Sequence, residues 1–262
     1  MTDLVANRLT IAGRLTGADF RLTPGELVAI VGPNGSGKTT LLRLLAGLRD
    51  ADAGEVRIGG LPLGPMPPRD RARHLAYLPQ RAEVAWPIGV VEMVALGRFA
   101  FGQGGAIGKH DLEIAAAMLG EVGCAHLCGR STATLSGGEL GLAALARVLA
   151  GAAALLLLDE PTAPLDPARQ HHAMGVLRAR VAAGHGVAVV LHDLNLAARY
   201  ADRIVWMREG RILGETGTSA GELAERIPAV FDVEPMIFAA PDGRIDGLAI
   251  SRRNPGSPPA PS

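Results

Sequence analysis

The sequence predicts an α/β protein built on a doubly wound parallel sheet. Three short apolar runs are typical of strands buried on both faces, and each precedes a segment with helical composition. The strands are expected at ELVAIVG (26–32), ALLLLDE (154–160) and GVAVVLHD (186–193), and the helices at 38–48, 167–183 and 194–202. Alternation of strand and helix implies a parallel sheet with helical crossovers. Ligands bind such sheets at the carboxyl ends of the strands, so we expect the chemistry there.

The N-terminal segment predicts a different kind of sheet. Short strand-like stretches within residues 3–30 are separated by turn residues, which favours antiparallel pairing, and residues 54–60 add another strand. The expected breaks fall at Gly13, Gly17 and Pro24-Gly25.

The middle of the chain changes character. Residues 81–134 are helical in pattern, hold a glycine-rich loop at 101–110, and contain no buried-strand run. We therefore expect a helical subdomain over 84–149, inserted into a single domain over 1–240. The core of that domain would comprise residues 1–83 and 150–240.

The C-terminal part contains a hairpin and then an extension. Residues 203–215 predict two strands turning at Glu209-Gly210. Turn residues gather at 239–247, and the Pro- and Ser-rich end at 251–262 predicts a disordered tail. The extension as a whole is assigned to 241–262.

Composition excludes several classes of function. The chain has 262 residues, and its 26 Lys and Arg balance its 26 Asp and Glu. This balance gives no electrostatic footprint for nucleic acid or an anionic membrane. No apolar run is long enough to cross a bilayer, and the N-terminus lacks a signal-peptide pattern. We expect a cytosolic protein that reaches a membrane only through a partner.

Two cysteines, Cys124 and Cys128, leave two interpretations open. Their spacing places them on one face of a helix-like segment predicted over 111–128. A metal site would need further ligands, and only His126 lies between them. The alternative is a pair of small, buried apolar side chains.

A glycine-rich stretch follows the first buried strand. GPNGSGKT (32–39) fits the pattern G-x-x-x-x-G-K-[ST] between a strand and a helix. Its backbone N–H groups can cradle phosphates, Lys38 can reach the β- and γ-phosphates, and Thr39 can ligate Mg²⁺. The alternative is a glycine-rich turn without a ligand.

Polar residues end the neighbouring apolar segments. Asp159 and Glu160 close the strand LLLLDE, where Asp159 could hold Mg²⁺ and Glu160 could polarise an attacking water. Two acids at a strand end can also serve solvation alone. His192 follows the next strand, which favours a γ-phosphate contact over a purely structural role. Gln80 ends the short piece AYLPQ (76–80) and is a candidate sensor of Mg²⁺ or the attacking water.

A second candidate anion site lies about a hundred residues further on. Ser136, Gly137 and Gly138 precede a long run of helix formers. A serine before two glycines at a helix start is typical of an N-terminus that receives an anion.

Together these motifs resemble those of the ATP-binding subunits of ABC transporters. The marks, in order, are Walker A GPNGSGKTT (32–40), Q-loop Gln80, signature LSGGE (135–139), Walker B LLLLDEP (155–161), D-loop APLD (163–166) and switch His192. The resemblance implies a P-loop NTPase core of the RecA-like type with an N-terminal antiparallel β subdomain and an inserted helical subdomain.

The resemblance also implies cofactors and residue roles. ATP and Mg²⁺ would be bound, with Glu160 as general base, His192 and Gln80 assisting, and Thr39, Gln80 and Asp159 at the metal. The remaining nucleotide contacts would come from Gly32, Pro33, Asn34, Gly35, Ser36, Gly37, Lys38, Thr39 and Thr40, and across a dimer from Ser136, Gly137, Gly138 and Asp166.

It further implies partners. A second copy of the chain would pack head to tail, and the helical subdomain would receive an integral-membrane permease at the cytoplasmic face of the membrane. Residues 82–98 and 191–212 look like the ATPases of importers for iron-siderophore complexes, haem or cobalamin, which also use a solute-binding protein. The alternatives are an importer of another solute class, a soluble ABC ATPase, a regulator without turnover, and a P-loop kinase. The kinase would leave the signature motif unexplained.

Two departures from the family pattern stand out. The stretch RLTIAGRL (8–15) lacks the aromatic residue that stacks on adenine in the family, and Ile11 lies about where that residue is expected. Arg14 can stack by cation–π geometry only on another ring, so loose selectivity for ATP over GTP is predicted. Leu140-Gly141-Leu142 replaces the usual polar residues after the signature, and Gly141 should cost the helix about 1 kcal/mol relative to alanine.

Overall fold

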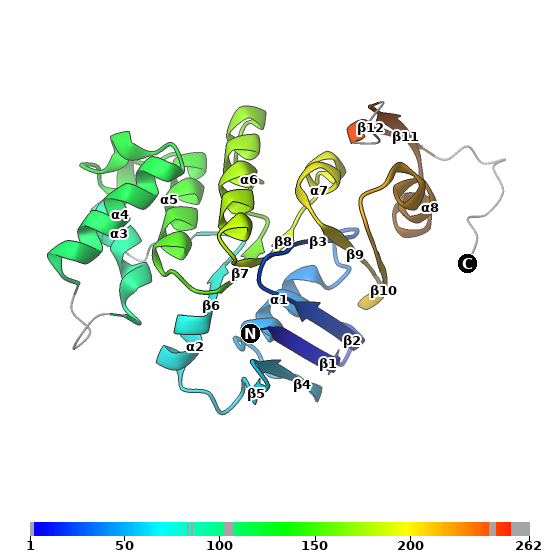
Figure 1. The fold of residues 1–262 in the computed structure, drawn as a ribbon, viewed down its shortest axis with the longest axis horizontal. Coiled ribbons are helices and arrows are strands. Elements are labelled where there is room, and N and C mark those ends of the chain that lie inside the picture. The colour runs from blue at the N-terminus through cyan, green and yellow to red at the C-terminus, as the bar shows by residue number, and fades with distance from the viewer. Residues whose placement is uncertain (1–2, 83, 85, 102–106, 241–244, 253–262) are drawn as a thin grey trace.

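A six-stranded sheet forms the centre of the computed structural model, which describes residues 3–82, 84, 86–101, 107–240 and 245–252 (Figure 1). The strand order is β10-β9-β3-β8-β7-β6, with β10 antiparallel to β9 and the other neighbouring pairs parallel. The strands are β3 (Leu27–Val31), β6 (Leu75–Leu78), β7 (Leu155–Asp159), β8 (Gly186–Val190), β9 (Arg203–Arg208) and β10 (Arg211–Thr216). The three predicted buried strands are confirmed, and so is the hairpin turning at Glu209-Gly210.

The central sheet divides the core into two clusters, which explains why its strands are continuously apolar. Every residue of β3 is buried, because both faces of the sheet are covered. Leu27 and Val31 pack on the side of the helical layer, whereas Val28 and Ile30 pack against the N-terminal sheet and the first helix. The alternation within one strand therefore places one core on each face.

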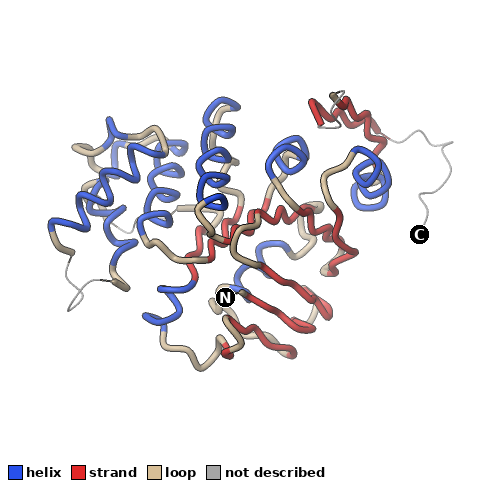
Figure 2. The backbone as a smooth tube through the Cα atoms, in the orientation of Figure 1, coloured by secondary structure: helices blue, strands red, loops and turns tan. Residues whose placement is uncertain are grey.

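Helices cover the sheet and build a separate group beyond its β6 edge (Figure 2). The helices are α1 (Lys38–Leu45), α2 (Pro68–His74), α3 (Val90–Ala95), α4 (Lys109–Glu121), α5 (Gly137–Ala150), α6 (Pro167–Ala182), α7 (Leu194–Tyr200) and α8 (Ala220–Phe231), with 3₁₀ turns η1 (Leu96–Arg98), η2 (Ala125–Leu127) and η3 (Thr132–Thr134). Helices α3, α4 and α5 pack on one another, so the predicted helical insertion is confirmed. Half of the predicted loop 101–110 lies outside the described residues, and its last two residues, Lys109 and His110, already belong to α4.

The N-terminal segment forms a four-stranded antiparallel sheet in the order β2-β1-β4-β5, and its predicted antiparallel pairing is confirmed. It comprises β1 (Leu4–Ile11), β2 (Leu15–Leu22), β4 (Ala53–Ile58) and β5 (Leu61–Pro62). The expected break at Gly17 is wrong, because β2 runs through it. Gly17 instead takes a φ of 58°, near a shift in the β1–β2 register, so it accommodates an irregularity within the strand.

The C-terminal extension folds further than the sequence predicts. Helix α8 leads into a hairpin of β11 (Val233–Ala239) and β12 (Ile245–Arg252), which packs against α7. The prediction of disorder is therefore wrong for Ser251 and Arg252, because both form the end of β12. Residues 241–244 and 253–262 lie outside the described residues.

The prediction of a helix through both cysteines is also wrong. Helix α4 ends at Glu121, Gly123 adopts a left-handed φ of 76°, and Cys124 and Cys128 flank the 3₁₀ turn η2. Burial raises the pKa of the Cys124 thiol. Within the described residues no cluster of three or more His, Cys, Asp or Glu could hold a metal ion, which favours the interpretation as small apolar side chains.

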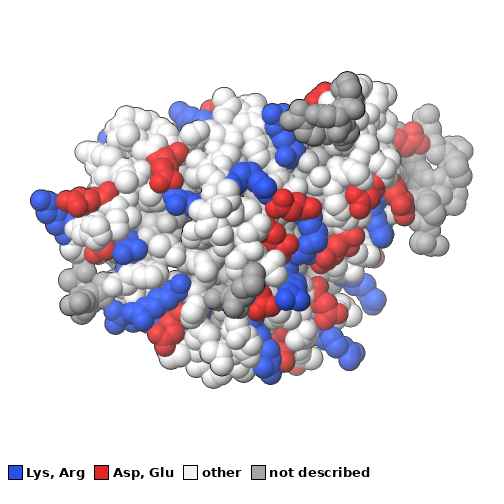
Figure 3. All heavy atoms as spheres, in the orientation of Figure 1, with Lys and Arg blue, Asp and Glu red and all other residues white. Residues whose placement is uncertain are grey.

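The distribution of charged side chains on the surface and the hydropathy of the helices agree with what the composition predicts. Acidic and basic side chains are interspersed over the face drawn in Figure 3. Among the described residues, no helix combines the length and the hydropathy that a membrane span requires.

Candidate functional site

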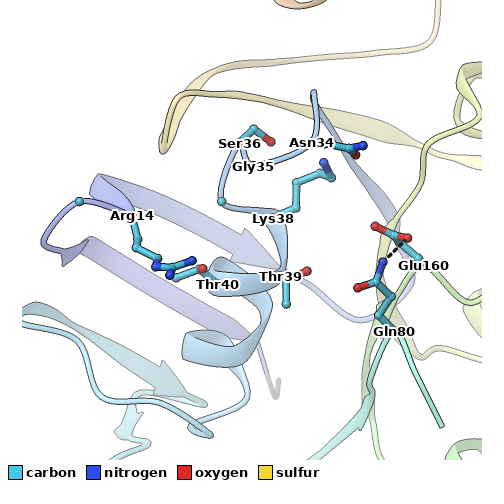
Figure 4. A pocket seen from close by; sticks show the side chains of 11 residues that line it. Arg14, Asn34, Gly35, Ser36, Lys38, Thr39, Thr40, Gln80 and Glu160 are labelled. Atoms are coloured by element: carbon cyan, nitrogen blue, oxygen red, sulfur yellow. Dashed lines mark hydrogen bonds between the residues drawn. The ribbon is translucent and has the colours of Figure 1, made fainter.

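A cavity of about 290 Å³ opens at the carboxyl end of β3, where the fold class predicts a ligand. It is lined by Gly13, Arg14, Asn34, Gly35, Ser36, Gly37, Lys38, Thr39, Thr40, Gln80 and Glu160 (Figure 4). The glycine-rich loop thus meets two of the polar residues predicted from other segments.

The loop between β3 and α1 can form only with glycine at two places. A Cβ at Gly32 would lie 2.1 Å from the Met207 carbonyl oxygen, so the strand leaves the sheet too close to β9 for any side chain. Gly37 caps α1 with a φ of 98°, a conformation that other residues rarely adopt. These constraints bend residues 33–37 around the N-terminus of α1.

The loop leaves polar groups available for an anion. Gly37 has no side chain to cap α1, and the first turn of α1 carries no acidic residue. The Ser36 hydroxyl is buried without a hydrogen-bond partner among the described residues. Uncapped N–H groups and an unpaired buried hydroxyl match the donors that phosphate oxygens accept.

Lys38 lies folded into this loop. Its ammonium group donates hydrogen bonds to the carbonyl oxygens of Gly32, at 2.7 Å, and Pro33, at 2.9 Å. Burial lowers the pKa of Lys38, and the carboxylates of Glu160 and Asp159 act in the opposite direction. A bound phosphate would add negative charge beside this buried ammonium and favour its charged form.

A buried carboxylate faces the start of α1. The Thr39 hydroxyl donates to Asp159 Oδ1 at 3.2 Å, and the Tyr77 hydroxyl lies 3.5 Å from Asp159 Oδ2. Asp159 is fully buried, and its burial raises the pKa of the carboxyl, opposed mainly by the bond from Thr39. Hydroxyl and carboxylate oxygens are the ligands that Mg²⁺ prefers, so this pair fits that ion. Tyr77 was not predicted, because a lone tyrosine in a short strand carries no distinguishing signal.

Glu160 is the centre of a second cluster of polar side chains at the cavity wall. Its Oε2 accepts from Gln80 Nε2 at 2.7 Å, and its Oε1 lies 2.5 Å from His192 Nε2. The backbone of Glu160 is left-handed, with a φ of 53°, which is uncommon for a residue with a side chain. The structure thus brings the three predicted catalytic residues together, although His192 itself does not line the cavity.

The remaining predicted contacts lie elsewhere in the chain. Ser136 Oγ accepts from Glu139 N at 3.3 Å and Glu139 Oε2 accepts from Ser136 N at 2.8 Å, so the two residues form a capping box at the start of α5. Asp166 caps α6 by accepting from Arg169 N at 3.0 Å. Of the signature and D-loop residues, none lines the cavity of this single chain.

Comparison with known proteins identifies the family. The family model for ABC transporters matches residues 15–163, and a hemin import ATP-binding protein from Methylobacillus flagellatus is 40% identical over 98% of both chains. The chain belongs to the ABC transporter ATPase family. A hemin import ATP-binding protein from Streptomyces coelicolor is 42% identical, over 89% of this chain and 84% of the relative.

Solved structures agree with this assignment. A dimeric ATP-binding cassette with ADP and phosphate superposes with a TM-score of 0.75 at 26% identity, covering 82% of this chain and 98% of that one. An ABC transporter in an inward-facing conformation gives a TM-score of 0.80 at 24% identity, covering 95% and 97%, and therefore supports the fold. The predicted ABC ATPase fold is confirmed, and the chain is an ATP-binding ATPase of this family.

The structure accounts for the glycine after the signature of this ABC ATPase. A Cβ at Gly141 would lie 3.0 Å from Pro164 Cγ in the D-loop, and a Cβ at Gly138 would lie 3.1 Å from the Pro164 carbonyl oxygen. Pro164 is thus held between two glycines of α5. The D-loop begins three residues after Glu160, so the absence of a side chain at 141 lets the signature helix approach the segment that carries Glu160.

Proposed function

We propose that this ABC ATPase hydrolyses Mg²⁺-ATP within a dimer and thereby powers uptake of haem, or a related metal chelate, through a separate permease. The convergence of Gln80, Glu160 and His192 beside the phosphate loop carries the proposal of hydrolysis. The names of relatives that align over nearly the whole chain support the choice of solute.

Binding of the triphosphate is assigned to the loop and to Lys38. Residues 34–40 line the cavity, and we assign their N–H groups to the phosphates. The Lys38 ammonium would exchange its carbonyl partners for β- and γ-phosphate oxygens. Thr39 and Asp159 would hold Mg²⁺, with Gln80 at its outer side. That ion, when bound, neutralises charge on the phosphates.

Glu160 is assigned the role of general base. It accepts a proton from the attacking water, whose oxygen bonds to the γ-phosphorus while the bond to the β–γ bridging oxygen breaks, giving ADP and phosphate. Both carboxylate oxygens are engaged in the structure described here, one by Gln80 and one by His192. Each carboxylate oxygen keeps a further acceptor site, so a water can donate to Glu160 while Gln80 and His192 hold the carboxylate in place.

A second copy of the chain would complete each site. At the start of α5, Ser136 and Gly137 are exposed and Gly138 is half-buried, and none of the three lines the cavity of their own chain. This unused anion site supports the proposal that it meets the γ-phosphate held by a partner copy, with Asp166 crossing the same interface. The solved cassette with ADP and phosphate is itself described as dimeric.

The permease is assigned to the helical group. Three large apolar side chains are exposed near Gln80 and α3: Trp86 at 68%, Leu96 at 44% and Phe99 at 57%. Trp86 lies between Gln80 and α3, Leu96 begins the turn η1 that follows α3, and Phe99 comes directly after η1. Exposed apolar side chains that gather in one patch mark sites of protein interaction, and the closeness of these three in sequence supports such a patch. We place the membrane partner there, which makes the chain a peripheral protein at the cytoplasmic face, with a solute-binding protein acting indirectly.

Two measurements test this proposal. Glu160→Gln in the full chain should bind ATP with unchanged affinity and lose at least about a hundredfold in turnover, because a general base contributes that much. Near-normal turnover would refute the assignment of Glu160. Trp86→Ser should weaken co-purification with the permease, whereas Leu213→Ser, an exposed leucine in β10, should not.

The solute is tested in proteoliposomes that contain the chain, its permease and a binding protein. Haem-loaded binding protein should stimulate ATP hydrolysis more than ferric-siderophore-loaded or cobalamin-loaded binding protein. Stimulation by a solute outside the metal chelates would favour the alternative of another importer class. Failure of the chain to join any permease would favour a soluble ABC ATPase.

A further inference from the structure

The start of the signature helix carries a negative charge as well as N–H groups that can bind an anion. Glu139 lies in the first turn of α5, and its Oε2 accepts from Ser136 N at 2.8 Å. The first N–H groups of a helix have no acceptor within it, so those of Gly137 and Gly138 remain for a ligand. An anion that arrives there meets the carboxylate of Glu139, and two negative charges repel each other.

Arg130 faces this carboxylate from the segment that precedes the helix. Its Nη1 donates to Glu139 Oε1 at 3.1 Å, so the two oxygens of Glu139 have different partners. The side chains are 39% and 17% exposed, so the carboxylate of this ion pair is largely shielded from solvent. His126 Nε2 lies 3.9 Å from the same oxygen, which is beyond hydrogen-bond distance. Arg130 therefore makes the closer of these two basic contacts with Glu139.

The position of Arg130 is fixed by the surrounding chain. Its backbone N donates to the Leu127 carbonyl at 2.9 Å, and its carbonyl oxygen accepts from Val90 N at 3.0 Å. The guanidinium group also donates from Nε to Thr134 Oγ1 at 3.3 Å and from Nη2 to the Thr134 carbonyl oxygen. One arginine thus bridges the turn η3 and the first turn of α5, and these contacts hold its charge beside Glu139.

A second carboxylate at this surface also has an arginine beside it. Asp166 caps α6, and Arg169 Nε lies 3.4 Å from Asp166 Oδ2. A Cβ at Gly138 would lie 3.9 Å from Arg169 Nη1, which places this pair close to the start of α5. Each of these two carboxylates is matched by one arginine, and Glu139 loses its match if Arg130 is removed.

We propose that Arg130 is a positioning residue that offsets the charge of Glu139 and so lets the start of α5 receive the γ-phosphate of a second copy's ATP. Glu139 keeps its structural role, because its bonds with Ser136 cap the helix. Arg130 acts through Glu139 and is assigned no contact with the nucleotide. The inference rests on the proposed function, from which it takes the dimer that shares each ATP.

The test measures the ATP-dependent dimer of the full chain by sedimentation, with Glu160→Gln as the parent so that ATP persists. Arg130→Ala should weaken the dimer about tenfold, because like charges brought together at an interface are strongly unfavourable. Arg130→Gln also loses the charge and should weaken the dimer likewise, whereas Arg130→Lys keeps the charge and should retain most of it. Arg57→Ala is the matched control and should change nothing, since Arg57 is 41% exposed and also pairs with a glutamate, Glu55, but lies in β4.

Removal of the second charge separates charge compensation from a purely structural role. Adding Glu139→Gln to Arg130→Ala should restore most of the dimer, because no carboxylate then remains to repel the phosphate. If Arg130 served only to hold Thr134, the double variant would be as weak as Arg130→Ala. ATP binding by the monomer should be unchanged in every variant, because the phosphate loop of the same chain is intact.

The outcomes also distinguish this inference from the proposed function. If the parent stays monomeric in saturating ATP, the shared site fails and this inference fails with it. If the parent dimerises and Arg130→Ala dimerises equally well, only the role of Arg130 is refuted. If Arg130→Ala stays weak after Glu139→Gln is added, charge compensation is refuted while the dimer stands. Should Arg130→Ala melt below the assay temperature, Arg130→Gln with and without Glu139→Gln provides the same comparison.

Discussion

Gly141→Ala should destabilise the protein, although alanine is the better helix former. In a helix interior the change from glycine to alanine gains about 0.5–1 kcal/mol. At this position the new methyl group would lie 3.0 Å from Pro164 Cγ, where carbon atoms prefer about 3.5–4.0 Å. Overpacking of this kind costs about 1–3 kcal/mol when the neighbours cannot move, so the net effect is a loss.

Pro164 is exposed, so its freedom to retreat from α5 is set by the backbone on either side of it. Its carbonyl oxygen lies against Gly138, and Ala163 N and Leu165 N donate to the carbonyls of Glu160, at 3.2 Å, and Thr162, at 3.1 Å. A shift of Pro164 would therefore disturb the segment that carries Glu160, the proposed general base. We expect Gly141→Ala to lower kcat several-fold with little change in KM.

Gly175 provides the matched control. It also lies in the interior of a helix, α6, but a Cβ there would meet nothing within 4 Å. Gly175→Ala should raise the free energy of unfolding by about 0.5–1 kcal/mol, without affecting turnover. The two variants should differ in melting temperature by about 4 °C or more. If Gly141→Ala stabilises the chain as much as Gly175→Ala does, the argument from the Pro164 contact is wrong.

Three further predictions concern the polar groups of the site and the signature helix. Glu139→Gln tests the capping box: bonds from Ser136 hold the pKa of Glu139 below its usual range, so the carboxylate stabilises the fold above about pH 4 and loses this effect as the pH falls through the lowered pKa. Urea unfolding should show wild type more stable than Glu139→Gln at pH 7, with a smaller gap at about pH 3.5; a constant gap would contradict this. Thr39→Val should raise the Mg²⁺ concentration that half-saturates ATPase activity and leave ADP binding in EDTA unchanged; an unaltered Mg²⁺ requirement would remove Thr39 from the metal site. Gln80→Ala and His192→Ala should each slow turnover and combine less than additively, because both side chains position Glu160, and a fully additive double variant would show that they act independently.

The sequence predicted the parts of this molecule whose pattern is local. Buried strands such as LLLLDE and the loop GPNGSGKT carry their structure in composition and spacing, and the acids that end a parallel strand necessarily lie at the ligand edge. Contacts between distant segments were not predictable in this way. The bond from Tyr77 to Asp159 and the packing of Gly141 on Pro164 depend on how strands and helices meet.

The wrong predictions at Ser251, Arg252 and Gly17 have a different cause. The end of β12 lies in SRRNPG, where a pattern rich in Arg, Asn, Pro and Gly is typical of disorder, yet Ser251 and Arg252 pair with β11. The break assigned to Gly17 failed because the strand tolerates a left-handed residue at a register shift. Pairing with a neighbouring strand decided both cases, and that pairing is not visible in the local sequence.

The start of the signature helix is proposed to receive the phosphate of a second copy's ATP. Gly137 tests it directly, because a Cβ there would meet nothing within 4 Å and an acidic residue suits the first turn of a helix. Sedimentation in ATP should show a dimer of Glu160→Gln, and adding Gly137→Asp should abolish the dimer while leaving ATP binding by the monomer intact. Gly137→Asn, equal in size but neutral, should retain more dimer than Gly137→Asp. If Glu160→Gln stays monomeric in saturating ATP, or if Gly137→Asp dimerises as well as Gly137→Asn, the shared site is contradicted.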